Sequence, residues 1–135
     1  METVKNTTIL YVDDDQDDLE MLQEAIMSVD PSYQIVKANN GEEGLARLLE
    51  MKLHKTLPCL VVLDINMPKL DGRQTFQRIK ADEALSNIPI VIFSTSSNKM
   101  DKMFFAGKNV EYITKPIYFP HLLQIAQKLL AYCSP

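Results

Sequence analysis

The sequence is poor in cysteine, contains no tryptophan and has no long run of apolar residues. Its two cysteines, Cys59 and Cys133, form neither a Cys-x-x-Cys motif nor a Cys/His cluster, which excludes a disulfide framework and a zinc module. We expect both to be inert thiols in a reducing compartment. The longest apolar run, Cys59–Leu63, is far shorter than the roughly 20 residues of a membrane span. Because the polar start Met1–Thr8 also lacks a signal-peptide core, we expect a soluble, cytoplasmic protein without membrane contact.

The chain also lacks an excess of basic residues. Its 14 lysines and arginines are outnumbered by 18 aspartates and glutamates, so the formal net charge is −4. Nucleic-acid binders carry basic patches, and anionic lipid surfaces repel acidic chains, so we expect neither as a partner. The length of 135 residues, with 46% hydrophobic and 24% charged residues, predicts one globular domain over residues 1–135 with its core at about 8–132.

The acidic residues are unevenly distributed, and six of them lie between Asp13 and Glu20. Like charges packed together repel one another, so this segment needs a physical reason. It is either a solvated helix start, where acids favour the helix dipole, or a binding site for a cation. The two interpretations are compatible, and the composition alone leaves both open.

Short β-branched apolar runs alternate with segments whose apolar residues recur at helical spacing. This pattern predicts five strands and five helices, and hence a parallel α/β sheet with helices on both faces. The strands are expected at Ile9–Val12, Ile35–Val36, Leu60–Leu63, Ile90–Phe93 and Glu111–Thr114. The helices are expected around Leu19–Val29, Leu45–Leu49, Phe76–Ile79 after a cap at Asp71, Asn98–Ala106 before Gly107, and Tyr118–Tyr132.

Chemically active side chains follow four of these strands. Asp13 and Asp14 come after the first strand, Asp64 after the third, Ser94 after the fourth and Lys115 after the fifth. Ligands of open parallel sheets bind beyond the carboxyl ends of the strands, so these groups are expected to converge. Three carboxylates and one ammonium sum to −2, which one divalent cation would neutralise. Mg²⁺ suits this set because it prefers a few carboxylate or carbonyl oxygens plus water.

Four segments in this order resemble the receiver domain of bacterial two-component response regulators: ILYVDDD, LVVLDINMPKLDG, IVIFSTS and YITKP. The resemblance covers Thr8 to about Tyr132, and its motifs are specific jointly rather than singly. It implies a flavodoxin-like (βα)5 doubly wound fold with the parallel strand order 2-1-3-4-5. Since the motifs span nearly the whole chain, we expect a stand-alone receiver.

The resemblance also implies a role for each matching residue. Asp64 would be the phosphoacceptor that attacks a phosphohistidine, while Ser94 and Lys115 would contact the phosphoryl group. Ser94 and Tyr112 would form the conformational switch, and Pro116 would follow a cis peptide that aims Lys115 inward. The Mg²⁺ ligands would be Asp13, Asp14, Asp64 and Asn66.

The implied function is a signalling switch rather than a metabolic enzyme. The phosphoryl donor would be a sensor histidine kinase or a histidine phosphotransfer protein, and the output would be a contact with a downstream protein. Two features depart from the family pattern: the expected fourth helix is short, and Thr95 is larger than the alanine often found after the hydroxyl residue. The short helix is expected to change the shape of the output surface, and Thr95 to narrow access to the phosphate.

Two alternatives are weighed against this interpretation. Asp13-Asp14-Asp15 after the first strand also matches the Asp-x-Asp motif of a small haloacid-dehalogenase-like phosphatase, with Asp13 as nucleophile. That alternative leaves the Asp64–Gly72 loop unexplained. A degenerate receiver used only for docking is disfavoured, because no catalytic position is substituted.

Overall fold

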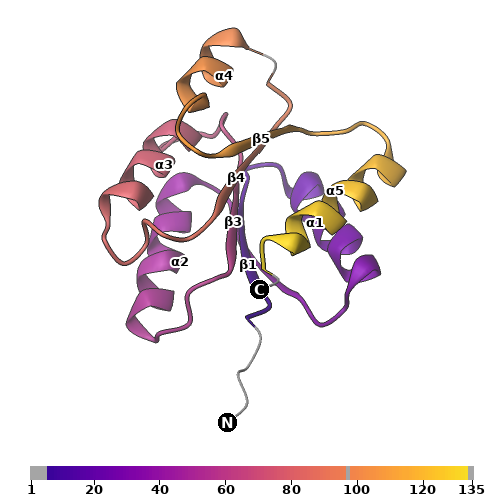
Figure 1. Cartoon of the computed structure of the whole chain (residues 1–135), viewed down its shortest axis with the longest axis horizontal. Coiled ribbons are helices and arrows are strands. Elements are labelled where there is room, and N and C mark those ends of the chain that lie inside the picture. Colours follow the sequence, from indigo (N-terminus) through magenta and orange to yellow (C-terminus); the bar gives the residue numbers. More distant parts are fainter. Residues whose placement is uncertain (1–5, 97, 134–135) are drawn as a thin grey trace.

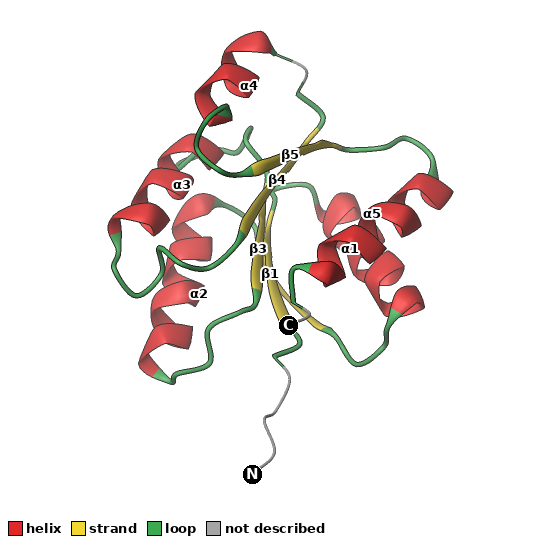
Figure 2. Cartoon of the chain, viewed as in Figure 1, coloured by secondary structure: helices red, strands yellow, loops and turns green. Residues whose placement is uncertain are grey.

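The computed structural model of the chain describes residues 6–96 and 98–133. Its five strands form one parallel sheet in the order β2-β1-β3-β4-β5, and helices cover both faces (Figures 1 and 2). The predicted fold class and strand order are therefore confirmed. The elements are β1 Thr8–Val12, α1 Gln16–Val29, β2 Gln34–Ala38, α2 Gly41–Leu53, β3 Leu60–Leu63, α3 Gly72–Ala81, β4 Ile90–Ser94, α4 Lys99–Phe105, β5 Glu111–Thr114 and α5 Phe119–Ala131.

The sheet separates two apolar clusters, one on each face. Successive residues of β1 alternate between them: Ile9 and Tyr11 pack under α1 and α5, whereas Leu10 and Val12 pack on the opposite face. The central strands β1, β3 and β4 are buried on both faces almost throughout, as expected for parallel strands. In Figure 1, α1 and α5 lie together on one face, while α2, α3 and α4 lie on the other.

Side-chain caps fix where several helices begin, and all helices begin at the carboxyl edge of the sheet. Asp71 accepts the backbone N–H of Gln74 and forms a capping box with it, which confirms Asp71 as the predicted cap of α3. Asp15 accepts the N–H groups of Asp17 and Asp18 at the start of α1. At the other end of α4, Gly107 has a φ of 77°, a conformation that glycine adopts without strain.

Cys59 and Cys133 form a disulfide, so the expectation of two inert thiols is wrong. They lie 74 residues apart in the sequence, but their Cα atoms are 5.1 Å apart. Cys59 directly precedes β3 and Cys133 follows α5. Each helix runs back to the amino edge of the sheet, so the end of α5 returns to the start of β3. Cysteine spacing along the sequence does not predict this proximity.

The helices give no indication of a membrane span. Within residues 6–96 and 98–133, none is both long enough and apolar enough to cross a bilayer.

Candidate functional site

Carboxylates from two neighbouring strands meet at the carboxyl edge of the sheet. Asp13 and Asp14 follow β1, and Asp64 follows β3. One carboxylate oxygen of each residue lies within 4.8 Å of the others. Asp13 is fully buried and Asp64 is 5% exposed, whereas Asp14 faces solvent. The three acids that the sequence predicted as metal ligands therefore form one cluster, open to solvent on the side of Asp14.

Asp13 is held in place by donors from its own segment. The hydroxyl of Tyr11 donates to Asp13 Oδ2 at 2.7 Å, and the N–H of Asp15 donates to Oδ1 at 2.9 Å. Burial, together with the charge of Asp13, raises the pKa of Tyr11 far above its usual value, so this phenol remains a donor. These bonds compensate for the burial of the Asp13 carboxylate and fix its orientation.

Lys115 extends from the end of β5 into the acidic cluster. Its Nζ lies 2.6 Å from Asp13 Oδ2 and 3.7 Å from Asp64 Oδ2, and its side chain is 8% exposed. Burial alone would lower the pKa of Lys115, but its hydrogen bonds to carboxylates and the charge of Asp64 raise that pKa above its ordinary value. The lysine is therefore charged at neutral pH, as the predicted role of a phosphoryl contact requires.

Asp18 belongs to the same site, although sequence reasoning placed it only in the acidic helix start. Its Oδ2 accepts a hydrogen bond from Lys115 Nζ at 2.7 Å. Asp18 lies in the first turn of α1, and every helix of this fold begins at the carboxyl edge of the sheet. Its place in the first helical turn could therefore have predicted that it belongs to the site. With Asp13, Asp14, Asp18 and Asp64 at −1 each and Lys115 at +1, the site carries −3.

The carboxylate of Asp64 is difficult to ionise in this setting. Burial raises its pKa, the charge of Asp13 raises it further, and Lys115, Ser94 and the N–H of Ile65 act in the opposite direction. The net result is a pKa of about 6, against an ordinary value of 3.8. At neutral pH the carboxylate is still mostly ionised, and a cation beside Asp64 would favour this nucleophilic form further.

The loop after Asp64 folds back tightly over that residue. The N–H of Gly72 donates to the carbonyl of Ile65 at 2.8 Å. A Cβ at Gly72 would lie 2.3 Å from the carbonyl oxygen of Asp64, so only glycine fits there. Asn66 lies exposed in this loop, two residues after Asp64. Its role as a carbonyl ligand of a metal stays a prediction.

Ser94 and Tyr112 contact the same turn after β4. Ser94 is fully buried, and its Oγ accepts the N–H of Ser96 at 3.1 Å. The hydroxyl of Tyr112 donates to the carbonyl of Ser96 at 2.8 Å. Because both side chains bond to the backbone of Ser96, a rearrangement around Ser94 would also affect the position of the Tyr112 ring.

A polar network that the sequence did not reveal continues from this turn into α3 and α4. Ser96 Oγ donates to Asp101 Oδ2 at 2.9 Å, and Arg73 Nη1 donates to Asp101 Oδ1 at 2.8 Å. Asp101 is 6% exposed, so this charge needs both partners. The turn that Ser94 contacts is thereby tied to the first turns of two helices.

The expected cis peptide at Pro116 is wrong, because every peptide bond within residues 6–96 and 98–133 is trans. Lys115 reaches the site without it. Its N–H donates to the carbonyl of Ser94 at 2.9 Å, which extends the pairing of β5 with β4 by one residue. The strand direction alone therefore carries the Lys115 side chain over the carboxyl edge.

Comparison with known proteins gives a consistent result. The family model described as "Response regulator receiver domain" matches residues 9–127. Protein PilH of Pseudomonas aeruginosa is 33% identical over 124 residues, which is 91% of this chain and 97% of that protein. Response regulator Rcp1 of a Synechocystis species is 30% identical over 122 residues, covering 88% of this chain and 83% of Rcp1.

Solved structures agree with the sequence matches. The phosphorylated cyanobacterial phytochrome response regulator RcpA superposes with a TM-score of 0.84 and 32% identity, covering 95% of this chain and 94% of RcpA. The Mn²⁺-bound form of response regulator Rcp1 superposes with a TM-score of 0.80 and 27% identity, covering 95% of both chains.

Proposed function

The chain belongs to the family of response regulator receiver domains, and from this premise we propose that it is a phosphoacceptor switch with Asp64 as the phosphorylated residue. One observation carries the proposal: Asp64 is the buried carboxylate at the end of β3 that has both acidic neighbours and a lysine around it. Carboxylate oxygens of Asp13 and Asp14 lie within 4.8 Å of one of its own, and Lys115 Nζ lies 3.7 Å from its Oδ2. We propose a single receiver over residues 1–135, with its core at about 8–132.

The proposed reaction is a phosphoryl transfer from a phosphohistidine. A carboxylate oxygen of Asp64 attacks phosphorus, the bond from phosphorus to the imidazole nitrogen breaks, and the nitrogen keeps the electron pair. Lys115, already charged and directed into the site, pairs with the phosphoryl oxygens, and Ser94 donates its hydroxyl to them. The donor would be a sensor histidine kinase or a histidine phosphotransfer protein in the cytoplasm.

The acidic cluster fits a divalent cation, which we propose to be Mg²⁺. Three carboxylate oxygens within 4.8 Å of one another are a donor set for a hard cation, and the relative Rcp1 has been solved in an Mn²⁺-bound form. Asp14, exposed at the mouth of the cluster, would be a direct ligand together with Asp64 and the carbonyl of Asn66. Asp13 would assist, since Tyr11 and Asp15 already occupy its oxygens. The cation would supply charge compensation for the phosphoryl group.

We expect Asp14→Ala to weaken Mg²⁺ binding by roughly tenfold or more, because it removes the exposed ligand and leaves the buried residues in place. Asp17→Ala is the matched control: Asp17 is another exposed acid at the start of α1, but it is outside the cluster. Titration of Mg²⁺, followed by chemical shifts or calorimetry, measures both. Equal affinity of Asp14→Ala and the wild type would contradict this assignment.

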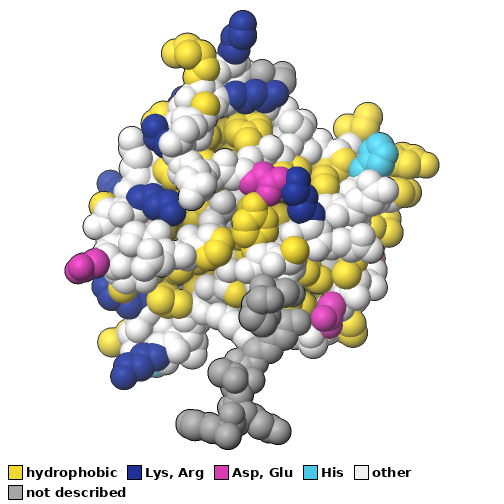
Figure 3. Space-filling view, in the orientation of Figure 1, with side chains coloured by type: hydrophobic (Ala, Val, Ile, Leu, Met, Phe, Trp, Pro, Cys, Tyr) yellow, Lys and Arg dark blue, Asp and Glu magenta, His cyan; other side chains and the backbone are white. Residues whose placement is uncertain are grey.

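The proposed output is a contact with a downstream protein rather than catalysis on a small substrate. Several large hydrophobic side chains are exposed on α4 and at the start of α5, and such side chains gather near the start of α5 in Figure 3. These two helices flank Tyr112 of β5, the proposed switch residue. The exposed set comprises Met100, Met103, Ile117, Tyr118 and Phe119.

We expect Ser94→Ala to retain phosphorylation at Asp64 but to lose about tenfold of the resulting population shift. A hydroxyl bonded to a charged phosphoryl group contributes roughly 1.5–3 kcal/mol, and that contact would differ between the two conformations. The measurement is the amide shift change of Lys99–Phe105 and Tyr112 on phosphorylation. Ser94→Thr should restore it, and Ser28→Ala, on the exposed face of α1, should not affect it. Full wild-type shifts in Ser94→Ala would refute the role of Ser94.

Nothing in the comparisons supports the phosphatase alternative, and the geometry of Asp13 argues against it. Asp13 is fully buried, and both of its oxygens accept hydrogen bonds from neighbouring groups. The decisive experiment is to map the modified residue by mass spectrometry after treatment with acetyl phosphate and Mg²⁺. A label on Asp64 that disappears in Asp64→Asn supports the switch. A label on Asp13, or none, contradicts it.

A further inference from the structure

The disulfide fastens the last turn of α5 to the amino edge of the sheet. Cys133 is 8% exposed and its N–H donates to the carbonyl of Leu130, so it is bonded to that last turn from just beyond the helix. Cys59 is partly buried, and its N–H donates to the carbonyl of Thr8 in β1. The bond therefore joins a helix end to two central strands, at the edge opposite to the acidic site.

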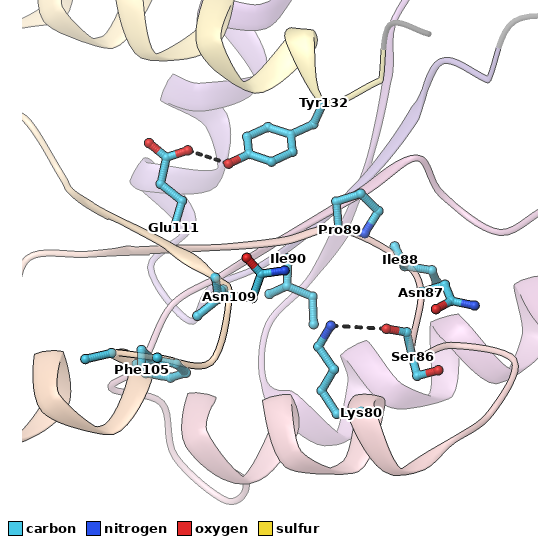
Figure 4. Close-up of a pocket in the computed structure, with 13 residues that line it drawn as sticks. Lys80, Ser86, Asn87, Ile88, Pro89, Ile90, Phe105, Asn109, Glu111 and Tyr132 are labelled. Atoms are coloured by element: carbon cyan, nitrogen blue, oxygen red, sulfur yellow. Dashed lines mark hydrogen bonds between the residues drawn. The ribbon is translucent and has the colours of Figure 1, made fainter.

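The same turn of α5 also contacts the start of β5. The hydroxyl of Tyr132 donates to Glu111, and Lys128 forms an ion pair with the same carboxylate. Burial alone would raise the pKa of Glu111, but these contacts outweigh it and lower the pKa below its ordinary value. Figure 4 shows Tyr132 reaching from the end of α5 to Glu111 at the rim of a cavity of about 900 Å³.

Glu111 directly precedes Tyr112, whose hydroxyl contacts the turn after β4. The end of α5 thus contacts β5 at the residue directly before Tyr112, the proposed switch residue. β5 is an edge strand and is only partly buried, so it depends on such side contacts more than the central strands do.

We propose that the Cys59–Cys133 pair is a site of reversible thiol–disulfide exchange, and that its state sets how firmly the end of α5 holds the start of β5. The partner is a dithiol reductant, such as a dithiol protein. One of its thiolates attacks Cys59 Sγ, the more exposed member of the pair, and Cys133 leaves as a thiolate that takes up a proton. The second thiol then displaces Cys59 from the mixed disulfide. The chain gains two electrons and two protons, and the partner becomes a disulfide.

Two physical arguments support an exchangeable bond. The proposed cytoplasmic location, on which this argument rests, is a reducing compartment, where disulfides that do form are usually transient and catalytic or redox-sensing. The bond also lies at the end of a helix, where the last turn opens more readily than the core. Reduction removes a cross-link between residues 74 positions apart, so the end of α5 then depends more on its apolar face and on the contacts of Glu111.

The test compares the oxidised and dithiothreitol-reduced wild type with the Cys59→Ser/Cys133→Ser variant. We expect reduction to lower Tm by roughly 10 °C and to speed amide exchange at the end of α5 and at Glu111. The double variant should behave as the reduced protein and ignore dithiothreitol. Tyr132→Phe retains the disulfide but lacks the hydroxyl. It should alter amide exchange at Glu111 but leave the effect of reduction on amide exchange at the end of α5 unchanged.

Two results would overturn the proposal. Absence of the bridged form by mass spectrometry, after incubation with oxidised glutathione, overturns the proposal. Unchanged amide exchange at Glu111 and the end of α5 after reduction also overturns it, because the bond then holds nothing at β5. If the double variant does not fold, the reduced wild type supplies the same comparison. The measurements need no phosphoryl group on Asp64, so their failure is distinguishable from failure of the proposed function.

Discussion

We expect Lys115→Met to lower the free energy of unfolding by about 3–5 kcal/mol in metal-free buffer. Lys115 is the cation among four carboxylates, and its Nζ contacts Asp13 at 2.6 Å and Asp18 at 2.7 Å. Methionine has a similar length and apolar stem, so the change removes the charge rather than the volume. The fully buried Asp13 would lose its charged partner, which is the costly way to break a buried pair.

Lys128→Met is the matched control for this change. Lys128 also pairs with a carboxylate, that of Glu111, but its side chain is 57% exposed. Surface pairs contribute roughly 0–1 kcal/mol, so we expect a loss of that size. Chemical denaturation at neutral pH measures both variants. A loss below about 1 kcal/mol in Lys115→Met would contradict the view that Lys115 is required to stabilise the buried acids.

We expect Asp64→Asn to stabilise the metal-free protein by roughly 3 kcal/mol at neutral pH, while abolishing phosphorylation. The folded-state pKa of Asp64 is about 6, against 3.8 for the free side chain, and a shift of one pKa unit corresponds to about 1.4 kcal/mol. Asparagine has the same shape and retains an oxygen that can accept the N–H of Ile65, an interaction of 2.9 Å in the wild type.

The pH dependence gives the sign of this effect. Because the folded-state pKa is raised, the folded wild type binds a proton more readily than the unfolded chain. Its stability is therefore fully present below pH 3.8 and is lost as the pH rises through about 6. The advantage of Asp64→Asn should thus be absent near pH 4 and complete above pH 7. Thermal melts across this range measure it.

Asp71→Asn, the same chemical change at a partly exposed helix cap, should show no such pH-dependent gain, because asparagine caps helices as well as aspartate does. A gain in Asp64→Asn that is independent of pH would mean that ionisation of Asp64 is not the cause.

Much of the fold could be predicted because the relevant information is local. Runs such as Leu60–Leu63 are apolar at every position, and that pattern occurs where a strand is buried on both faces. The boundaries of α4 and α5 agreed with the prediction to within one residue, whereas α2 was predicted only around Leu45–Leu49 but spans Gly41–Leu53. β2 was predicted as Ile35–Val36 but extends over Gln34–Ala38, because pairing with β1 orders its polar residues too.

The strand ends Asp13, Asp64, Ser94 and Lys115 could be placed in one site from sequence alone, since parallel strands present their carboxyl ends at one edge. The sequence could also be matched to a family, and the family to a strand order. These inferences need only the order of elements along the chain, not the packing between them.

The tertiary structure decided which side chains meet across that framework. Lys115 pairs with Asp18, 97 residues earlier, because its long side chain reaches from the end of β5 to the first turn of α1. Arg73 meets Asp101 because α3 and α4 lie on the same face. Cys59 meets Cys133 because α5 returns to the amino edge of the sheet. Each contact depends on the relative position of two elements, which is set by the packing of the whole core and has no signature in either segment alone.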